Sequence, residues 1–144
     1  NLEKSSISNI ELSDKLNLIT LKIGVYDYLQ SISLTNIPNI TDLTITNSNN
    51  LTEIVIDNLP MLSSLTYYNI PSLQKITINS TDVDELYFES YDNLTDVNLN
   101  DNVSLTILSV KSCNYLSNFY FIDNENLEEL YSAISNLEEF KQVA

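Results

Sequence analysis

The segment LTEIVIDN, residues 51–58, carries the pattern that decides the fold of this 144-residue chain. Its apolar side chains at Leu51, Ile54 and Ile56 follow the motif L-x-x-L-x-L, and Asn58 comes two residues later. The motif restarts thirteen times, at intervals of eleven residues except for two intervals of ten. The first residues of the units are Ile7, Leu18, Leu29, Ile40, Leu51, Leu62, Leu73, Val83, Leu94, Leu105, Leu116, Leu127 and Leu137. Such a regular repeat predicts a stack of similar structural units.

The middle apolar residue of the motif divides the units into two alternating kinds. Odd-numbered units carry a β-branched or aromatic residue there, such as Ile54, whereas even-numbered units carry Leu, such as Leu65. The structural period is therefore 22 residues, and we expect Ile54 to stack between Ile32 and Ile76.

Each unit predicts one short β-strand, because its second and third apolar residues lie two positions apart and share one face. A strand this short cannot bury its apolar face alone, so the units must stack. The expected fold is all-β or mostly β, a parallel β-solenoid of about six 22-residue turns with two short strands in each turn. We interpret residues 1–144 as a single repeat domain with regular coils over residues 7–126. Residues 127–144 also fit the spacing of an amphipathic helix, so they form either a last coil or a helical cap.

The eighth position of each unit predicts the turns. Ten of the first twelve units place Asn, Asp or Ser there, and such side chains hydrogen-bond nearby backbone where a chain leaves a strand. Stacked coils would align Asn36 with Asn58 and Asn47 with Asn69. We expect these amide columns to satisfy buried backbone N–H and C=O groups at the corners.

The spacing Leu51-x-x-Ile54-x-Ile56-x-Asn58 resembles the leucine-rich repeat, in the form with nested half-length repeats found in bacterial and protist surface proteins. The polar residue comes one position earlier than in that family, and the outer half of each repeat lacks a helical pattern. A flattened, two-sided β-solenoid is therefore an equal description. The resemblance implies a non-catalytic binding or adhesion module, extracellular or at the cell surface, that presents a rigid repeat surface to protein or glycan partners.

Composition excludes several classes of function. The formal net charge is −14, and all six positive residues are Lys, so a nucleic acid partner is not expected. No apolar run approaches the ~20 residues that cross a bilayer, so membrane insertion is not expected either. With no His, no Arg and one Cys, the usual pairs of nucleophile and base cannot be assembled. We predict that the chain is not an enzyme and uses no cofactor, with a carbohydrate-active solenoid enzyme as a disfavoured alternative.

One stretch gathers acidic side chains, and it raises the question of a calcium site. Its members are Asp82, Asp84, Glu85, Glu89, Asp92 and Asp96. The stretch lacks the ordered ligand spacing and the glycine of a calcium-binding loop. Acidic residues at alternate positions of a strand usually form its solvent-exposed face, so no metal site is predicted.

Exposed aromatic residues give the candidate binding site. If the even-numbered units share one face, Tyr68 and Tyr87 lie as outward neighbours on adjacent coils, framed by Glu89 and Lys111. Tyr120 marks a second, smaller candidate on the odd face. Tyrosine on a rigid sheet loses little entropy for a large contact area, although it is also a common residue of exposed strands.

The ends of a solenoid expose unpaired strand edges and apolar core. No capping pattern covers residues 1–12. Self-association through the terminal coils, which would build a filament or surface layer, is therefore the alternative to a binding module.

Overall fold

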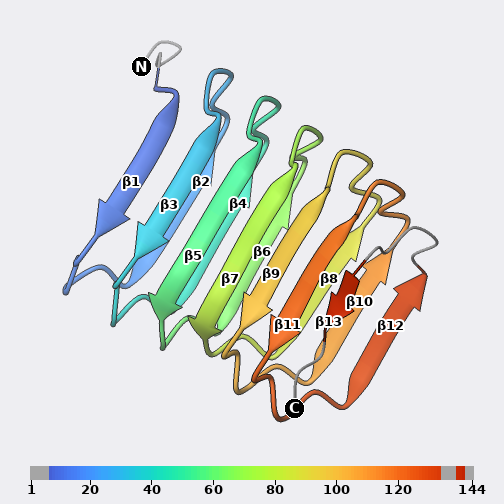
Figure 1. Ribbon diagram of the computed structural model, residues 1–144. Helices are drawn as coiled ribbons and strands as arrows, with labels where there is room; N and C mark the ends of the chain where they lie inside the picture. Colours follow the sequence, from blue (N-terminus) through green and yellow to red (C-terminus); the bar gives the residue numbers. More distant parts are fainter. Residues whose placement is uncertain (1–6, 134–138, 142–144) are drawn as a thin grey trace.

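The computed structural model describes residues 7–133 and 139–141, and it is a parallel β-solenoid of about six turns (Figure 1). All regular elements in these ranges are strands. They are β1 (Asn9–Ser13), β2 (Thr20–Gly24), β3 (Ser31–Thr35), β4 (Asp42–Thr46), β5 (Glu53–Leu59), β6 (Ser64–Tyr68), β7 (Lys75–Thr81), β8 (Glu85–Glu89), β9 (Asp96–Asn100), β10 (Ile107–Lys111), β11 (Asn118–Ile122), β12 (Glu129–Ala133) and β13 (Glu139–Lys141). The predicted fold class is confirmed.

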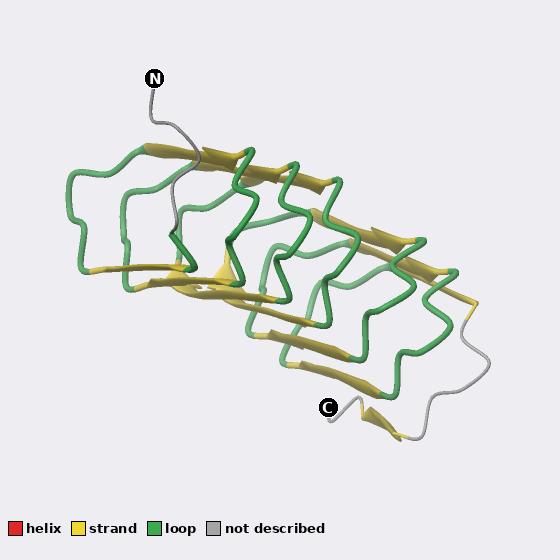
Figure 2. Ribbon diagram, turned by 90° about the horizontal axis from the view of Figure 1, so that it is seen from above, coloured by secondary structure: helices red, strands yellow, loops and turns green. Residues whose placement is uncertain are grey.

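The strands form two layers (Figure 2). One layer is a seven-stranded parallel sheet that contains the odd-numbered strands in the order β1-β3-β5-β7-β9-β11-β13. Ile54 pairs with Ile32 on one side and with Ile76 on the other, which confirms the 22-residue period. The even-numbered strands form the second layer, which faces the first across the core.

The core lies between the two layers and consists of the apolar residues of the repeat. Ile32, Leu34, Leu51 and Leu105 are fully buried, because each coil covers the apolar face of the next. The apolar core thins out at the first coil, where Ile10 is only half-buried.

Each of the first eleven units places its eighth residue in the left-handed backbone region. These residues have φ between 52° and 60°, and they are Asp14, Val25, Asn36, Asn47, Asn58, Asn69, Ser80, Ser90, Asp101, Ser112 and Asp123. They are the eighth residues of their units. Asn and Asp, which tolerate this region better than other non-glycine residues, occupy seven of the eleven positions.

The predicted amide columns exist, but their role differs from the expected one. Asn58 donates from Nδ2 to Oδ1 of Asn36 at 2.8 Å, and Asn69 donates in the same way to Asn47 at 2.9 Å. These side chains are exposed and bond to each other rather than to buried backbone groups. The expectation was wrong because the left-handed turn directs the eighth side chain outward, away from the core.

Replacing Asn58 by Ala should lower the free energy of unfolding by roughly 1–2 kcal/mol, because alanine is disfavoured in the left-handed region. Asn58→Gly removes the same side-chain hydrogen bond but accepts a φ of 57°. Urea unfolding of both variants should show the smaller loss for glycine. Equal losses would instead assign the effect to the hydrogen bond with Asn36.

A buried polar ladder replaces apolar packing at the corner that follows the later odd-numbered strands. Ile37 and Leu59 fill this corner in the earlier coils and are fully buried. Thr81, Asn102 and Asn124 occupy the equivalent positions in the later coils. Oδ1 of Asn102 accepts hydrogen bonds from the hydroxyl of Thr81 at 2.7 Å and from its backbone N–H at 3.2 Å. Oδ1 of Asn124 accepts from the backbone N–H of Asn102 at 3.0 Å, so the ladder links three coils.

The C-terminal stretch contains two further strands. β12 pairs with β10, and β13 pairs with β11, both in parallel. The helical cap considered for residues 127–144 falls partly on residues 134–138 and 142–144, which lie outside the described residues. Across the described part of the chain, no helix has the length and apolar character needed to cross a membrane.

Candidate functional site at a break in the even-strand layer

The even-numbered layer is divided into two sheets. One contains β2-β4-β6 and the other β8-β10-β12, and no pairing joins β6 to β8. Within each half the predicted outward columns hold, since Thr66 pairs with Thr44 and Tyr87 pairs with Ser109. Between the halves the strand pairing stops, so Tyr68 of β6 and Tyr87 of β8 lie on adjacent coils with a break in the layer between them.

The break coincides with a shortened corner. Two residues separate Ser80 from Val83, whereas three separate Asn58 from Leu62 at the preceding odd-to-even corner. The odd-numbered sheet absorbs the missing residue without losing its pairing, because Lys75 of β7 pairs with Asp96 of β9. The solenoid therefore opens on one side only, and the upper layer in Figure 2 is interrupted at this point.

Large aromatic side chains fill the opening from the core side. Tyr67 occupies the third apolar position of its unit, where the preceding even unit has Ile45. Its ring stacks on the buried ring of Phe88 with centroids 5.7 Å apart, and it lies 6.2 Å from the ring of Tyr91. The three rings therefore form one aromatic cluster beneath the break, with centroid distances in the ordinary range of aromatic pairs.

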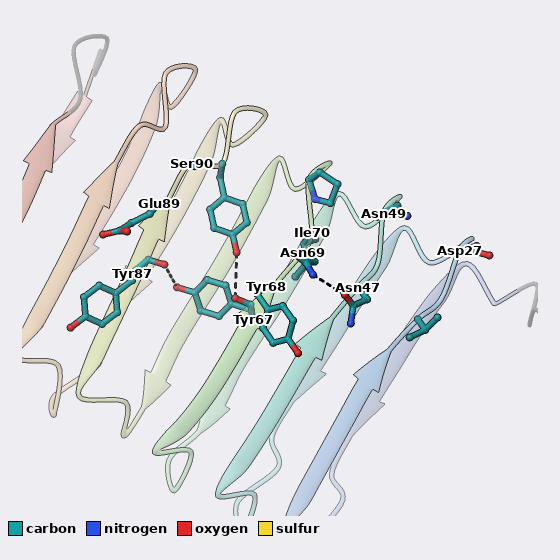
Figure 3. A pocket seen from close by; sticks show the side chains of 13 residues that line it. Asp27, Asn47, Asn49, Tyr67, Tyr68, Asn69, Ile70, Tyr87, Glu89 and Ser90 are labelled. Atoms are coloured by element: carbon teal, nitrogen blue, oxygen red, sulfur yellow. Dashed lines mark hydrogen bonds between the residues drawn. The ribbon is translucent and has the colours of Figure 1, made fainter.

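Two tyrosine hydroxyls bridge the break. The hydroxyl of Tyr67 donates to the backbone carbonyl of Tyr87 at 2.8 Å, and the hydroxyl of Tyr91 donates to the carbonyl of Tyr67 at 3.5 Å (Figure 3). Neither carbonyl has a strand partner across the break. The side chains thus supply hydrogen bonds to main-chain groups that are left without a sheet ladder.

Burial of the bridging tyrosines changes their acidity. Burial raises the pKa of Tyr67 far above its ordinary value near 10, and the neighbouring Tyr91 adds to the shift. Burial also raises the pKa of Tyr91 to about 12. On the outer side of the break, the pKa of Tyr87 is raised because its hydroxyl donates to Oε2 of Glu85 at 2.7 Å.

These shifts predict a loss of stability at alkaline pH. A tyrosine whose pKa is raised by folding contributes stability below the unfolded pKa near 10 and loses it as the pH rises toward the folded value. The free energy of unfolding should fall above pH 10 by up to about 1.4 kcal/mol per pH unit for one such group. In Tyr67→Phe the decline should be shallower, although this variant should already be less stable at pH 7 because the carbonyl of Tyr87 loses its donor. Equal slopes in urea unfolding between pH 9 and 11 would contradict the assignment to Tyr67.

A surface depression of about 740 Å³ lies over the break. We call it the β6–β8 depression. Its lining residues are Val25, Asp27, Asn47, Asn49, Tyr67, Tyr68, Asn69, Ile70, Pro71, Tyr87, Glu89, Ser90 and Tyr91. Figure 3 shows the tyrosines of β6 and β8 beside each other, with the amides of Asn47 and Asn69 toward the earlier coils.

The structure brings together four of the five residues that the sequence singled out. Tyr68 and Tyr87 are 50% and 45% exposed, and both line the β6–β8 depression together with Glu89. Lys111 lies next to them, with Nζ 3.7 Å from Oε1 of Glu89 and 5.3 Å from the ring centre of Tyr131. Tyr120 lies on β11 in the odd-numbered sheet and belongs to a different surface.

Sequence reasoning missed the inner half of the site. Tyr67 and Tyr91 had not been singled out, and neither had the amides of Asn47 and Asn69 as groups facing a ligand. A signal was available in the ten-residue interval between Leu73 and Val83. That interval, next to a tyrosine at a core position, marks the place where the regular stack fails.

Two other sequence features, Glu89 apart, lie outside the β6–β8 depression: the acidic stretch and the N-x-S/T motifs. No group of three or more acidic, Cys or His side chains in the described ranges is arranged to hold a metal ion. The five N-x-S/T motifs begin at Asn39, Asn50, Asn79, Asn93 and Asn102. All five side chains make hydrogen bonds to residues of a neighbouring coil, and Asn102 is fully buried. These asparagines therefore hold coils together in the folded chain.

No protein family model, no curated protein and no solved structure matches this chain.

Proposed function

We propose that this protein is a non-catalytic binding module and that the β6–β8 depression is its recognition site. The observation that carries the proposal is the placement of Tyr68 and Tyr87 on opposite sides of the sheet break. Each ring is about half exposed on a strand held by its neighbours, so little conformational entropy is lost when a ligand covers it. Concave sites with a few aromatic and polar groups are the usual form of ligand sites in proteins.

The resemblance to leucine-rich repeats supports the same proposal from the sequence side. The motif of residues 51–58 resembles that of a family whose repeats present rigid surfaces to protein or glycan partners. We extend to this chain the adhesion role and the extracellular or cell-surface location that the resemblance implies. The family's curved horseshoe does not carry over, because both halves of each coil here contain strands.

The direct test is a binding screen with immobilised glycans and extracellular proteins, followed by titration of the hits. We expect the double variant Tyr68→Ala, Tyr87→Ala to weaken the affinity at least about 10-fold, as for central aromatic residues of a binding site. The matched control is Tyr115→Ala, since Tyr115 is 69% exposed and lies outside the β6–β8 depression. Loss of binding in the control alone, or in neither variant, would place the recognition surface elsewhere.

Self-association is a second candidate, favoured by the apolar surface of the first coil. Leu16 and Ile19 are 63% and 59% exposed, and a hollow between Leu12, Leu18 and Leu21 lies beside them. Among the strands that the structure describes, β1 pairs only with β3 and β2 only with β4. The double variant Leu16→Asp, Ile19→Lys should abolish any concentration-dependent assembly measured by sedimentation velocity. Tyr68→Ala should leave such assembly unchanged.

A further inference from the structure

We propose that the β6–β8 depression takes a neutral carbohydrate, bound as a short oligosaccharide segment. This inference rests on the proposed function and names the ligand class of the same site. It follows from the charge of the lining, the exposed rings, the free capacity of the amides and the way in which the break is bridged.

The charge of the lining selects against anionic ligands. Among the described residues that line the depression, Asp27 and Glu89 are acidic and none is basic. Lys111 lies beside the depression, and its Nζ is paired with Oε1 of Glu89 at 3.7 Å. Phosphate, sulfate or sialic acid groups would meet the carboxylates of Asp27 and Glu89 with no basic side chain in the lining, whereas an uncharged sugar meets hydrogen-bond acceptors.

The exposed rings supply flat apolar surfaces on both sides of the break. Tyr68 comes from β6 and Tyr87 from β8. The ring of Tyr87 is held in place by the hydrogen bond from its hydroxyl to Glu85 at 2.7 Å. Pyranose rings carry apolar C–H faces that stack on such rings while their hydroxyls point to the rim. An aromatic surface surrounded by polar groups therefore matches a sugar better than a purely apolar ligand.

The amide pair at the edge of the depression offers one donor and one acceptor. The hydrogen bond from Nδ2 of Asn69 to Oδ1 of Asn47 uses one group of each side chain. It leaves Nδ2 of Asn47 and Oδ1 of Asn69 with hydrogen-bonding capacity. A sugar hydroxyl donates and accepts at once, so adjacent hydroxyls can satisfy both amides. Asn49 and Asp27 extend this polar rim.

An extended peptide is a poorer occupant of the same break. Addition of a strand would need the main-chain acceptors of β6 and β8, as in other strand-addition complexes. The carbonyls of Tyr67 and Tyr87 already accept hydrogen bonds from tyrosine hydroxyls. The rings of Tyr67 and Phe88 also fill the space beneath. The depression is therefore open to a ligand from above and closed to a strand between β6 and β8.

The test is a titration of the full chain with a panel of defined ligands. The neutral probes are tetrasaccharides of glucose, galactose, mannose and N-acetylglucosamine. The comparison probes are sialyllactose, a galacturonic acid tetramer and a hexapeptide rich in Val and Thr. Binding is measured by calorimetry and by NMR shifts of the side-chain amides of Asn47 and Asn69.

We expect at least one neutral tetrasaccharide to bind and to shift both amide signals. Tyr68→Ala and Tyr87→Ala should each raise its Kd at least 10-fold, with Tyr115→Ala as the matched control that keeps the parent Kd. Asn47→Gly preserves the left-handed backbone, which has a φ of 53°, and should raise the Kd about 3- to 10-fold. Circular dichroism melts serve to check that each variant compared is folded.

Binding of only the acidic saccharides or the hexapeptide through Tyr68 and Tyr87 would overturn the neutral carbohydrate and leave the proposed recognition site standing. Binding of a neutral tetrasaccharide that is insensitive to both tyrosines would overturn the location of the site. If no probe binds, the carbohydrate assignment is wrong, and the recognition site itself then depends on the wider screen described above.

Discussion

Replacing Asn102 by Ala should lower the free energy of unfolding by about 3 kcal/mol, because it leaves several buried polar groups without partners. Asn102 is fully buried and accepts hydrogen bonds from the hydroxyl and the backbone N–H of Thr81. Its Nδ2 donates to the backbone carbonyl of Ile78 at 2.8 Å. Each buried group left unsatisfied costs about 1–3 kcal/mol, and the small cavity adds to this loss.

The matched control for this variant is Asn126→Ala. Asn126 is exposed, and its side chain donates one hydrogen bond, to the backbone carbonyl of Val103. Water can replace that bond, so urea unfolding should show a loss well below that of Asn102→Ala. If the two variants lose the same stability, the ladder of Thr81, Asn102 and Asn124 contributes no more to the free energy of unfolding than an exposed hydrogen bond. The buried polar groups must then find other partners in Asn102→Ala.

The period of the apolar residues was sufficient to predict the coils. A 22-residue spacing brings Ile32, Ile54 and Ile76 together whatever the details of the corners, because parallel strands stack in register when their buried faces coincide. Spacing is a local property that the sequence displays directly. For the same reason the amide pairs of Asn36 with Asn58 and of Asn47 with Asn69 were predicted correctly as pairs.

The break in the even-numbered layer could not be predicted in the same way. The ten-residue interval before Val83 shortens one corner, but each coil belongs to two layers. The sequence does not say which layer keeps its ladder. The outcome depends on how side chains pack in each layer, and at the break the ring of Tyr67 stacks on the ring of Phe88 on the even side. The sequence therefore predicted the exposed tyrosines of the candidate site, Tyr68 and Tyr87. It did not predict the break in the layer or the inner residues Tyr67 and Tyr91.

The polar corner shows a second limit of pattern reasoning. Asn102 in the sequence is one of many asparagines and the start of an N-x-S/T motif. Nothing in that pattern marks it as buried. Its role follows only once Thr81 and Asn124 are placed above and below it in neighbouring coils.

Replacing Phe88 by Ala should have the largest effect on stability, a loss of about 3–5 kcal/mol for a fully buried aromatic residue. Phe88 is also the ring on which Tyr67 stacks, 5.7 Å away, beneath the β6–β8 depression. Its removal would admit water to Tyr67, and the raised pKa of that tyrosine would move back toward its ordinary value. A spectrophotometric titration should then show tyrosine ionising at lower pH in the folded variant.

The variant Phe119→Ala is the control that separates the loss of stability from the change in the pKa of Tyr67. Phe119 is equally buried, and its ring lies tilted against that of Phe121 with centroids 5.4 Å apart, but both residues lie on β11 in the unbroken odd-numbered sheet. We expect a similar loss in urea unfolding and no change in the ionisation of Tyr67. Affinity for a ligand of the β6–β8 depression should likewise fall in Phe88→Ala and persist in Phe119→Ala, measured where both variants are folded. If the two variants alter the tyrosine titration equally, Phe88 contributes to the core in general, and the support of the break must come from Tyr67 and Tyr91 alone.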